Sequence, residues 1–375
     1  MTDYKNLIDG KMVDNGQWLE VLNPATEQVV GRVPSCGKEE LDSAVAAARR
    51  AFTQWKKTTA EERQQVVQGI AAAIKENADE LYRLLTSEQG KPHAQAQQEI
   101  YGAAGLAAAQ STLTLDDVIN QDDDTRLSRT RRVPVGVVGG IVPWNFPIMM
   151  AIQKIVPALV AGCTIVLKPS PFTPLTTLRV AELIKDVVPA GTVNIITGED
   201  TLGPLITEHP DIDKITFTGS TATGKKIMEG ASGDLKRITL ELGGNDASIV
   251  LPDADVEKVA EQLFWSSFSN AGQVCIAAKR IYIHEDIYDD LSKAIADYAK
   301  TVVVGDGSQQ GTGVGPIQNK KQYERVLDLI QDAKDNGYKF LTGGDKDPSG
   351  TGYYVPITIL DNPPEDARIV AEEQF

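Results

Sequence analysis

The sequence has few of the residues that bind metal ions or build disulfide frameworks. Its 375 residues include three cysteines and three histidines, and the histidines are scattered singly. No pair of cysteines has metal-ligand spacing, and an odd number does not suggest a disulfide framework. We therefore expect no metal site, and the cysteine content fits a reducing compartment such as the cytoplasm.

Positive charge and long apolar runs are also scarce. Fifty-two acidic side chains against 37 basic ones leave a net charge of -15. Nucleic acids and anionic membranes attract basic surfaces, so this balance argues against both as partners. No apolar run approaches the roughly 20 residues that cross a bilayer. The N-terminus lacks the basic-then-apolar pattern of a signal peptide. We expect a cytoplasmic protein that binds neither nucleic acid nor membrane.

Helical patterns dominate the N-terminal third of the chain. One apolar face recurs at spacings of three and four and consists of Leu41, Val45, Ala48, Phe52 and Trp55. Thr59 and Glu62 have the spacing of a capping box, which predicts a helix start. We expect the first 110 residues to be mostly helical. Residues 112–132 combine three successive aspartates with four arginines. They fit an extended arm, an edge strand or a solvated loop.

From Val135 onward, short apolar runs alternate with helical segments. The runs that read as strands are 135–142, 163–168, 193–197, 214–219, 238–244 and 247–251. Such alternation is typical of βαβ units and predicts a parallel sheet. Buried parallel strands are almost continuously apolar, as these runs are. The sequence therefore predicts an α/β fold, and its length suggests two or three domains.

Two segments could bind a phosphorylated ligand. Gly219–Gly224 follows the strand-like stretch 215–217 and opens a helical stretch, where free N–H groups suit a phosphate. A βα turn without any ligand is an equally good interpretation. Lys168 ends the run 163–168, where its ammonium group could reach phosphate or ribose oxygens. A solvated loop lysine is the simpler alternative.

Three further residues could carry chemistry. Cys275 lies in a glycine-containing turn, although most free cysteines are small buried apolar residues. Glu241 ends a strand-like run before two glycines and would face a cleft at the sheet edge, or be a surface carboxylate before a turn. Asn145 is bracketed by Pro143 and Pro147, which would hold its amide rigidly, as an oxyanion hole requires. A structural turn with a capping Asn is the alternative.

Taken in order, these segments resemble the aldehyde dehydrogenase superfamily, of the NAD(P)-dependent hydrolytic type. The matching motifs are VPWNFP (142–147), KPSPFTPL (168–175), FTGSTATG (217–224), ELGG (241–244), GQVC (272–275) and AEEQF (371–375). The resemblance implies that Cys275 is the nucleophile and that Asn145 stabilises the oxyanion. It implies that Glu241 activates water and that Lys154 lies near the active site.

The resemblance also implies residues that bind NAD or NADP. Those expected to be cofactor-binding are Val142, Trp144, Lys168, Ser170, Pro171, Gly219, Ser220, Thr223, Leu242, Gln322, Glu373 and Phe375. NAD-specific members commonly carry a glutamate three residues after the motif lysine, where this chain has Pro171. Without that carboxylate nothing repels a 2′-phosphate, so the choice between NAD and NADP stays open.

The resemblance further implies a domain organisation. Residues 1–111 and 133–242 would form a Rossmann-like dinucleotide-binding domain, and 112–132 an oligomerisation arm of a homodimer or homotetramer. Residues 243–375 would form a second α/β domain, catalytic and incomplete at its C-terminus, because family members continue past the AEEQF motif. The implied substrate is a small aldehyde. Alternatives are a coenzyme A-acylating relative, which generally lacks the glutamate of ELGG, and a non-catalytic structural member or inactive fragment.

Overall fold

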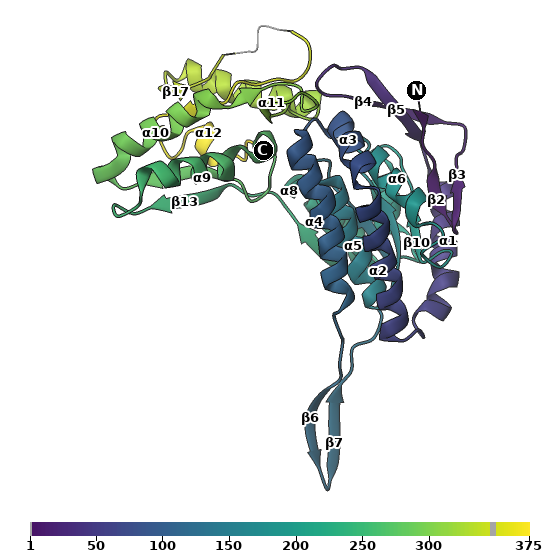
Figure 1. Ribbon diagram of the computed structural model, residues 1–375. Helices are drawn as coiled ribbons and strands as arrows, with labels where there is room; N and C mark the ends of the chain where they lie inside the picture. Colours follow the sequence, from purple (N-terminus) through teal and green to yellow (C-terminus); the bar gives the residue numbers. More distant parts are fainter. Residues whose placement is uncertain (1, 346–349) are drawn as a thin grey trace. The chain divides into compact units, whose positions relative to one another are not determined.

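The computed structural model describes residues 2–345 and 350–375, which divide into two compact α/β units. Unit 1 comprises Met1–Val21, Gly31–Tyr82 and Gln97–Glu241. Unit 2 comprises Leu22–Val30, Arg83–Ala96 and Leu242–Phe375. Figure 1 traces the chain with its helices and strands. The α/β fold class predicted from the sequence is confirmed.

A seven-stranded sheet forms the centre of unit 1, in the order β12-β11-β8-β9-β10-β2-β3. The parallel strands are β8 (Val137–Ile141), β9 (Thr164–Lys168), β10 (Val193–Ile195), β11 (Lys214–Thr218) and β12 (Arg237–Glu241). Every residue of β9 and β10 is buried. These strands lie in the predicted apolar runs, as expected of a parallel sheet that is covered on both faces.

Helices of unit 1 pack on this sheet in two groups. Both groups contact the sheet, and the first consists of α1 (Lys38–Trp55), α7 (Leu202–Glu208) and α8 (Thr221–Ser232). The other consists of α5 (Pro147–Val160) and α6 (Leu175–Ile184), on which α2 (Ala60–Glu76) packs. Helices α3 (Ala78–Gln89) and α4 (His93–Ser111) follow α2. The predicted capping box is present at the start of α2, where Thr59 and Glu62 bond reciprocally.

The expectation of mostly helix in the first 110 residues is wrong for the first 34. Strands there are β1 (Thr2–Asp3), β2 (Asn6–Ile8), β3 (Lys11–Val13), β4 (Trp18–Leu22) and β5 (Val29–Pro34). β2 pairs with β10, with Leu7 opposite Ile195. Strands this short depend on partners far along the chain, and local periodicity does not report such partners.

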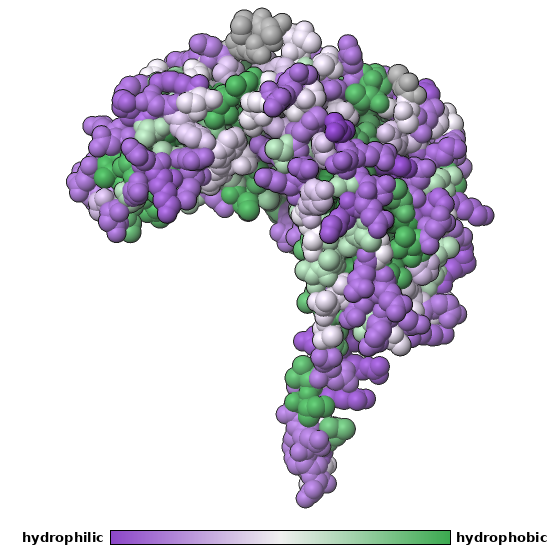
Figure 2. Space-filling model, in the orientation of Figure 1, coloured by the Kyte–Doolittle hydropathy of each residue, from purple (hydrophilic) through white to green (hydrophobic). Residues whose placement is uncertain are grey.

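Residues 112–132 contain an antiparallel hairpin, so this segment is an extended arm of two strands and not an irregular loop. Its strands are β6 (Val118–Asp123) and β7 (Arg126–Thr130). The Asp123 side chain closes the turn by accepting hydrogen bonds from the backbone N–H groups of Thr125 and Arg126. Figure 2 shows hydrophobic residues gathered along the hairpin and a hydrophilic tip. Ile119 and Leu127 are 54% and 62% exposed.

Unit 2 is built around the parallel pair β13 (Asp246–Val250) and β14 (Ala278–Ile283), which α9 (Val256–Phe268) connects. The remaining helices are η1 (Ser269–Gly272), η2 (Glu285–Ile287), α10 (Tyr288–Thr301), α11 (Lys320–Asp335) and α12 (Arg368–Ala371). Short strand pairs are β15 (Val303–Val304) with β16 (Thr312–Val314), and β17 (Phe340–Thr342) with β18 (Ile359–Leu360). Phe264 is fully buried among Trp265, Phe268 and Tyr298. This aromatic core holds α9 against α10.

Candidate active site

The predicted site residues of unit 1 follow four neighbouring strands at one edge of the sheet. The strand registers align these ends, because Ile141 pairs with Lys168 and with Phe217, and Thr218 pairs with Glu241. The residues that follow β8 are Val142, Trp144 and Asn145, and those at the end of β9 are Lys168, Ser170 and Pro171. Gly219, Ser220 and Thr223 follow β11, and Glu241 ends β12. Ligands of parallel α/β sheets bind beyond the carboxyl ends of the strands. The fold therefore brings these candidates to a common edge.

Asn145 lies in the loop between β8 and α5 and is 5% exposed. Pro147 begins α5, a position where a missing N–H costs no hydrogen bond. The Glu99 carboxylate of α4 accepts hydrogen bonds from the N–H groups of Ile148 and Met149 at 3.0 and 3.2 Å. A negative charge at a helix N-terminus is stabilising. Glu99 thus anchors the helix start that fixes the Asn145 loop.

Lys154 and Glu241 form an electrostatically coupled pair within unit 1. Lys154 is buried on α5 and donates hydrogen bonds to the hydroxyl oxygens of Thr218 and Thr216 at 2.8 and 3.3 Å. Burial lowers the pKa of Lys154 to about 8, although the nearby negative charge of Glu241 opposes the shift. Glu241 is exposed at the end of β12. This carboxylate can therefore reach solvent while a buried cation acts on it.

The segments at the ends of β9 and β11 combine a buried cation with a capped helix start. Lys168 is 3% exposed, and burial lowers its pKa to about 8 while Asp200 opposes the shift. Ser220 caps α8 by accepting a hydrogen bond from the Thr223 N–H at 3.2 Å. A Cβ added at Gly219 would lie 2.5 Å from the Phe217 ring, so only glycine fits this turn. A helix start and a buried lysine, both at the carboxyl ends of strands of one sheet, suit an anionic ligand.

In unit 2, Cys275 follows a strained turn. Asn270, Ala271 and Gly272 all have positive φ angles, of 52°, 57° and 75°. Such a run is costly for non-glycine residues and occurs where surrounding contacts impose it. Gln273 is fully buried and donates to the Asn270 carbonyl at 2.8 Å, and its own side-chain oxygen accepts from the Gln318 N–H. These contacts fix the backbone that presents Cys275.

The thiol of Cys275 differs from the other two in its surroundings. Cys275 is half-buried, whereas Cys36 and Cys163 are buried. Burial raises the pKa of Cys36 to about 12. A Cβ added at Gly244 would lie 2.4 Å from the Cys275 carbonyl oxygen, so the glycines of ELGG let two backbones meet here. Of the three cysteines, Cys275 is the one whose setting leaves a thiolate accessible.

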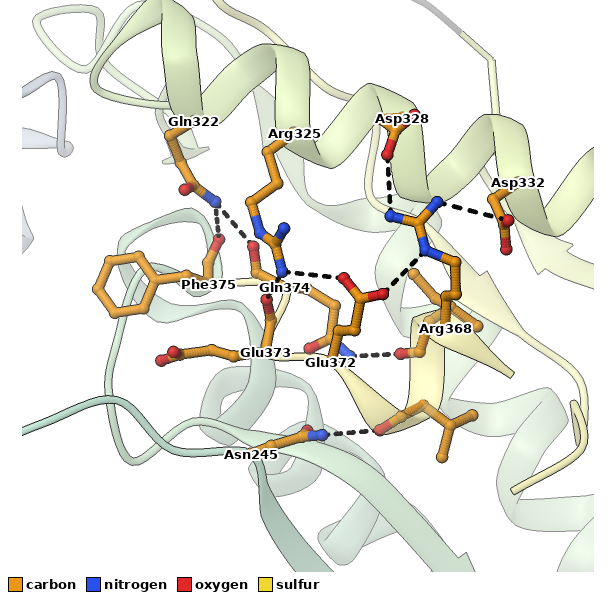
Figure 3. A network of polar contacts seen from close by, with 12 residues as sticks. Asn245, Gln322, Arg325, Asp328, Asp332, Arg368, Glu372, Glu373, Gln374 and Phe375 are labelled. Carbon is orange, nitrogen blue, oxygen red and sulfur yellow. Dashed lines mark hydrogen bonds and ion pairs between the residues drawn. The ribbon is translucent and has the colours of Figure 1, made fainter. Parts of the chain in front are cut away.

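In unit 2, the predicted residues Gln322, Glu373 and Phe375 lie together at the C-terminal segment (Figure 3). The Glu373 carboxylate accepts a hydrogen bond from the Gly244 N–H at 3.0 Å. Gln322 donates to the carbonyl oxygens of Gln374 and Phe375 at 2.7 and 3.1 Å. Leu242 directly precedes the glycines that meet Glu373. Unit 2 therefore groups Leu242, Gln322, Glu373 and Phe375 near the turn of Cys275.

Several residues that organise these loops were not anticipated from the sequence. Glu99, Gln273 and Gln95 belong to this group, and Gln95 accepts a hydrogen bond from the Asn270 N–H at 2.9 Å. A polar residue on the apolar face of a predicted helix is the one signal that could have marked Glu99, which is buried, whereas Gln95 is half-buried. In the described part of the chain, no three His, Cys, Asp or Glu side chains gather as a metal ion would require. None of the helices in residues 2–345 and 350–375 is both long and apolar enough to cross a membrane.

Comparison with known proteins now decides the family. A model of the aldehyde dehydrogenase family matches residues 12–375. The chain belongs to this family. It is thus an aldehyde dehydrogenase, an NAD(P)-dependent oxidoreductase.

Individual relatives agree with this assignment. A probable aldehyde dehydrogenase of Pseudomonas sp is 44% identical, over 98% of this chain and 75% of its own. The NADP(+)-dependent succinate-semialdehyde dehydrogenase of Escherichia coli is 39% identical, over 98% of this chain and 78% of its own. The NAD+ complex of the Bacillus cereus aldehyde dehydrogenase superposes with a TM-score of 0.96 at 38% identity, covering 100% of this chain and 78% of that one. The expected cofactor, NAD or NADP, is in keeping with these proteins.

Proposed function

We propose that this aldehyde dehydrogenase oxidises an aldehyde to a carboxylic acid through a covalent intermediate on Cys275. The observation that carries the proposal is the setting of the three thiols. Cys275 is half-buried and follows a strained turn whose backbone is held by hydrogen bonds, whereas Cys36 and Cys163 are buried. Strain of this kind persists where function requires it.

The proposed reaction begins when the Cys275 thiolate attacks the aldehyde carbon and gives a thiohemiacetal. The Asn145 amide and the Cys275 backbone N–H would donate hydrogen bonds to the new oxyanion. When bound, the nicotinamide ring supplies a hydride acceptor, and loss of hydride leaves a thioester on Cys275. Glu241 would remove a proton from water as that water attacks the thioester. The products are the carboxylic acid and the free thiol.

Lys154 supports this role of Glu241. The ammonium group of Lys154 is buried on α5, and the charge of Glu241 acts on it. Because burial lowers the pKa of Lys154 to about 8, its positive charge is lost as the pH rises through that value. We therefore place Lys154 beside Glu241 in the deacylation step.

The residues present fit a dinucleotide. Lys168 is a buried cation that, among the described residues, donates a long hydrogen bond to the Pro169 carbonyl at 3.5 Å, and its ammonium group could turn to ribose or phosphate oxygens. Ser220 and Thr223 begin α8 with its positive dipole end. Val142, Trp144, Ser170 and Gly219 complete this half of the proposed site. Leu242, Gln322, Glu373 and Phe375 would serve the nicotinamide half. Pro171 leaves no carboxylate at the position where one would repel a 2′-phosphate.

We further propose the domain roles implied by the resemblance. Residues 1–111 and 133–242 would bind the dinucleotide, and 243–375 would carry the nucleophile. The arm at 112–132 would join copies of the chain in a homodimer or homotetramer, since its hairpin exposes Ile119 and Leu127. We propose the cytoplasm as its compartment, where thiols stay reduced.

The proposal is tested by following reduced nicotinamide formation by the purified chain with NAD+ and NADP+. The aldehyde panel includes succinic semialdehyde and phenylacetaldehyde, which relatives of this chain are named for. We expect turnover with at least one aldehyde, and its loss in Cys275→Ala but not in Cys163→Ala. No turnover with any aldehyde and either cofactor would contradict the proposal.

A further inference from the structure

A network of ion pairs joins α11 to the segment that carries Glu373 (Figure 3). We call Arg325, Asp328, Asp332, Arg368 and Glu372 the α11–α12 clamp. Arg368 contacts three carboxylates, those of Asp328, Asp332 and Glu372, at 3.0, 3.4 and 2.8 Å. Arg325 contacts Glu372 from the other side, at 3.3 Å. The clamp therefore draws α12 and the residues after it onto one face of α11.

The clamp acts on the backbone next to the Glu373 carboxylate. Arg325 donates a hydrogen bond to the Glu373 carbonyl oxygen at 2.8 Å. Asn245 holds α12 itself by donating to the Val370 carbonyl at 2.7 Å. With its carbonyl group and the preceding helix held in this way, Glu373 directs its carboxylate toward Gly243 and Gly244. A Cβ at Gly243 would lie 2.1 Å from a Glu373 oxygen, so the fit is close.

The charged residues around Glu373 favour one fixed position of its carboxylate. Lys279 of β14 lies in its field, because Glu373 opposes the burial that lowers the pKa of Lys279 to about 8. Glu372 is held ionised, since its hydrogen bond from Arg368 lowers the pKa of that carboxyl. Exposed ion pairs are individually weak. Here, however, one arginine serves three carboxylates, so the geometry is over-determined.

We propose that the α11–α12 clamp is a positioning device for Glu373 and thereby sets the affinity for the nicotinamide half of the cofactor. The inference rests on the proposed function, in which Glu373 meets that half. Its five members are positioning residues, because they act through Glu373 and need not touch the cofactor. Recognition of the adenosine half depends on Lys168 and Ser220 in unit 1 and is independent of the clamp.

The experiment compares two ligands that differ in the nicotinamide half. Calorimetry measures binding of NAD+ and of ADP to the 375-residue chain and to Arg368→Met. If the chain prefers NADP+, that cofactor and adenosine 2′,5′-bisphosphate replace them. We expect Arg368→Met to weaken dinucleotide binding about five- to tenfold and to leave binding of the adenosine half unchanged. Lys293→Met is the matched control, since it removes an exposed ion pair with Asp297 elsewhere in unit 2, and should change neither.

Two further variants separate positioning from general damage. Arg368→Lys keeps the charge but loses the fork geometry, so it should restore affinity in part. The double variant Asp328→Asn with Asp332→Asn removes the anchors of Arg368 without altering Glu372, and should reproduce the selective loss even if Arg368→Met folds poorly. Equal loss of both ligands, or unchanged dinucleotide binding, would overturn the clamp. Absence of dinucleotide binding by the unaltered chain would instead refute the proposed function, and the clamp with it.

Discussion

Burial of the charged Lys154 side chain should lower the free energy of unfolding at neutral pH. In the folded chain this group has a pKa of about 8, against 10.5 for a free lysine. Below pH 8 both states are protonated, so the full cost of burying the charge opposes folding. At 1.36 kcal/mol per pKa unit that cost is about 3 kcal/mol. Between about pH 8 and 10.5 the folded state loses the proton first, and the cost diminishes.

Replacing Lys154 with methionine should therefore change the pH dependence of unfolding. Linkage predicts that the parent regains about 2 kcal/mol from this group between pH 7 and pH 9.5, and Lys154→Met does not. At pH 7 the variant gains from the removed charge and loses the hydrogen bonds to Thr216 and Thr218, so we expect a net gain of about 1 kcal/mol. Its rate of aldehyde oxidation should fall, because Glu241 loses a neighbouring cation.

The assay is urea unfolding at pH 7 and pH 9.5, followed by tryptophan fluorescence. A Trp265→Phe background leaves only the tryptophans of unit 1, the unit that contains Lys154. Lys38→Met serves as a control, because Lys38 is exposed on α1. Identical pH dependence in the parent and in Lys154→Met would show that the Lys154 charge does not oppose folding.

Three other substitutions probe the site. Glu99→Ala should destabilise unit 1 by about 2 kcal/mol, because two N–H groups at the start of α5 lose a charged acceptor; Glu99→Gln keeps an acceptor and should cost less in the same urea assay. Pro171→Glu should lower kcat/KM for NADP+ at least tenfold relative to NAD+, because the carboxylate repels a 2′-phosphate, and an unchanged ratio would contradict this. Gly244→Ala should slow aldehyde oxidation at least tenfold, since its Cβ would lie 2.4 Å from the Cys275 carbonyl oxygen. Gly305→Ala, whose Cβ meets only the Thr312 hydroxyl at 3.5 Å, should be nearly silent in that assay.

The parallel sheet of unit 1 could be predicted because its information is local. Runs such as 163–168 and 193–197 are mostly apolar, the strands that they form are fully buried, and the helix between them has regular apolar spacing. The reciprocal bonds of Thr59 and Glu62 are equally local. In contrast, β2 is three residues long and pairs with β10 far along the chain. The sequence around Leu7 carries no trace of that partner, so the early strands were missed.

The residues of the candidate site divide in the same way, into those marked by local motifs and those that act through distant contacts. Asn145, Glu241 and Cys275 could be named from short motifs, since glycines and prolines mark the loops that present them. The groups that hold those loops could not, because Glu99, Gln95 and Gln273 act across long sequence separations. The α11–α12 clamp is likewise invisible in sequence, where Asp332 and Arg368 are ordinary charged residues.

Peptide mapping by mass spectrometry can locate the covalent intermediate that we propose on Cys275. Glu241→Gln, which should retain hydride transfer and stall hydrolysis, is incubated with the oxidised cofactor and an aldehyde that the parent oxidises. We expect a burst of reduced nicotinamide and an acyl group on the peptide containing Cys275. Acylation of Cys36 or Cys163, or continued turnover without any acylated cysteine, would contradict it.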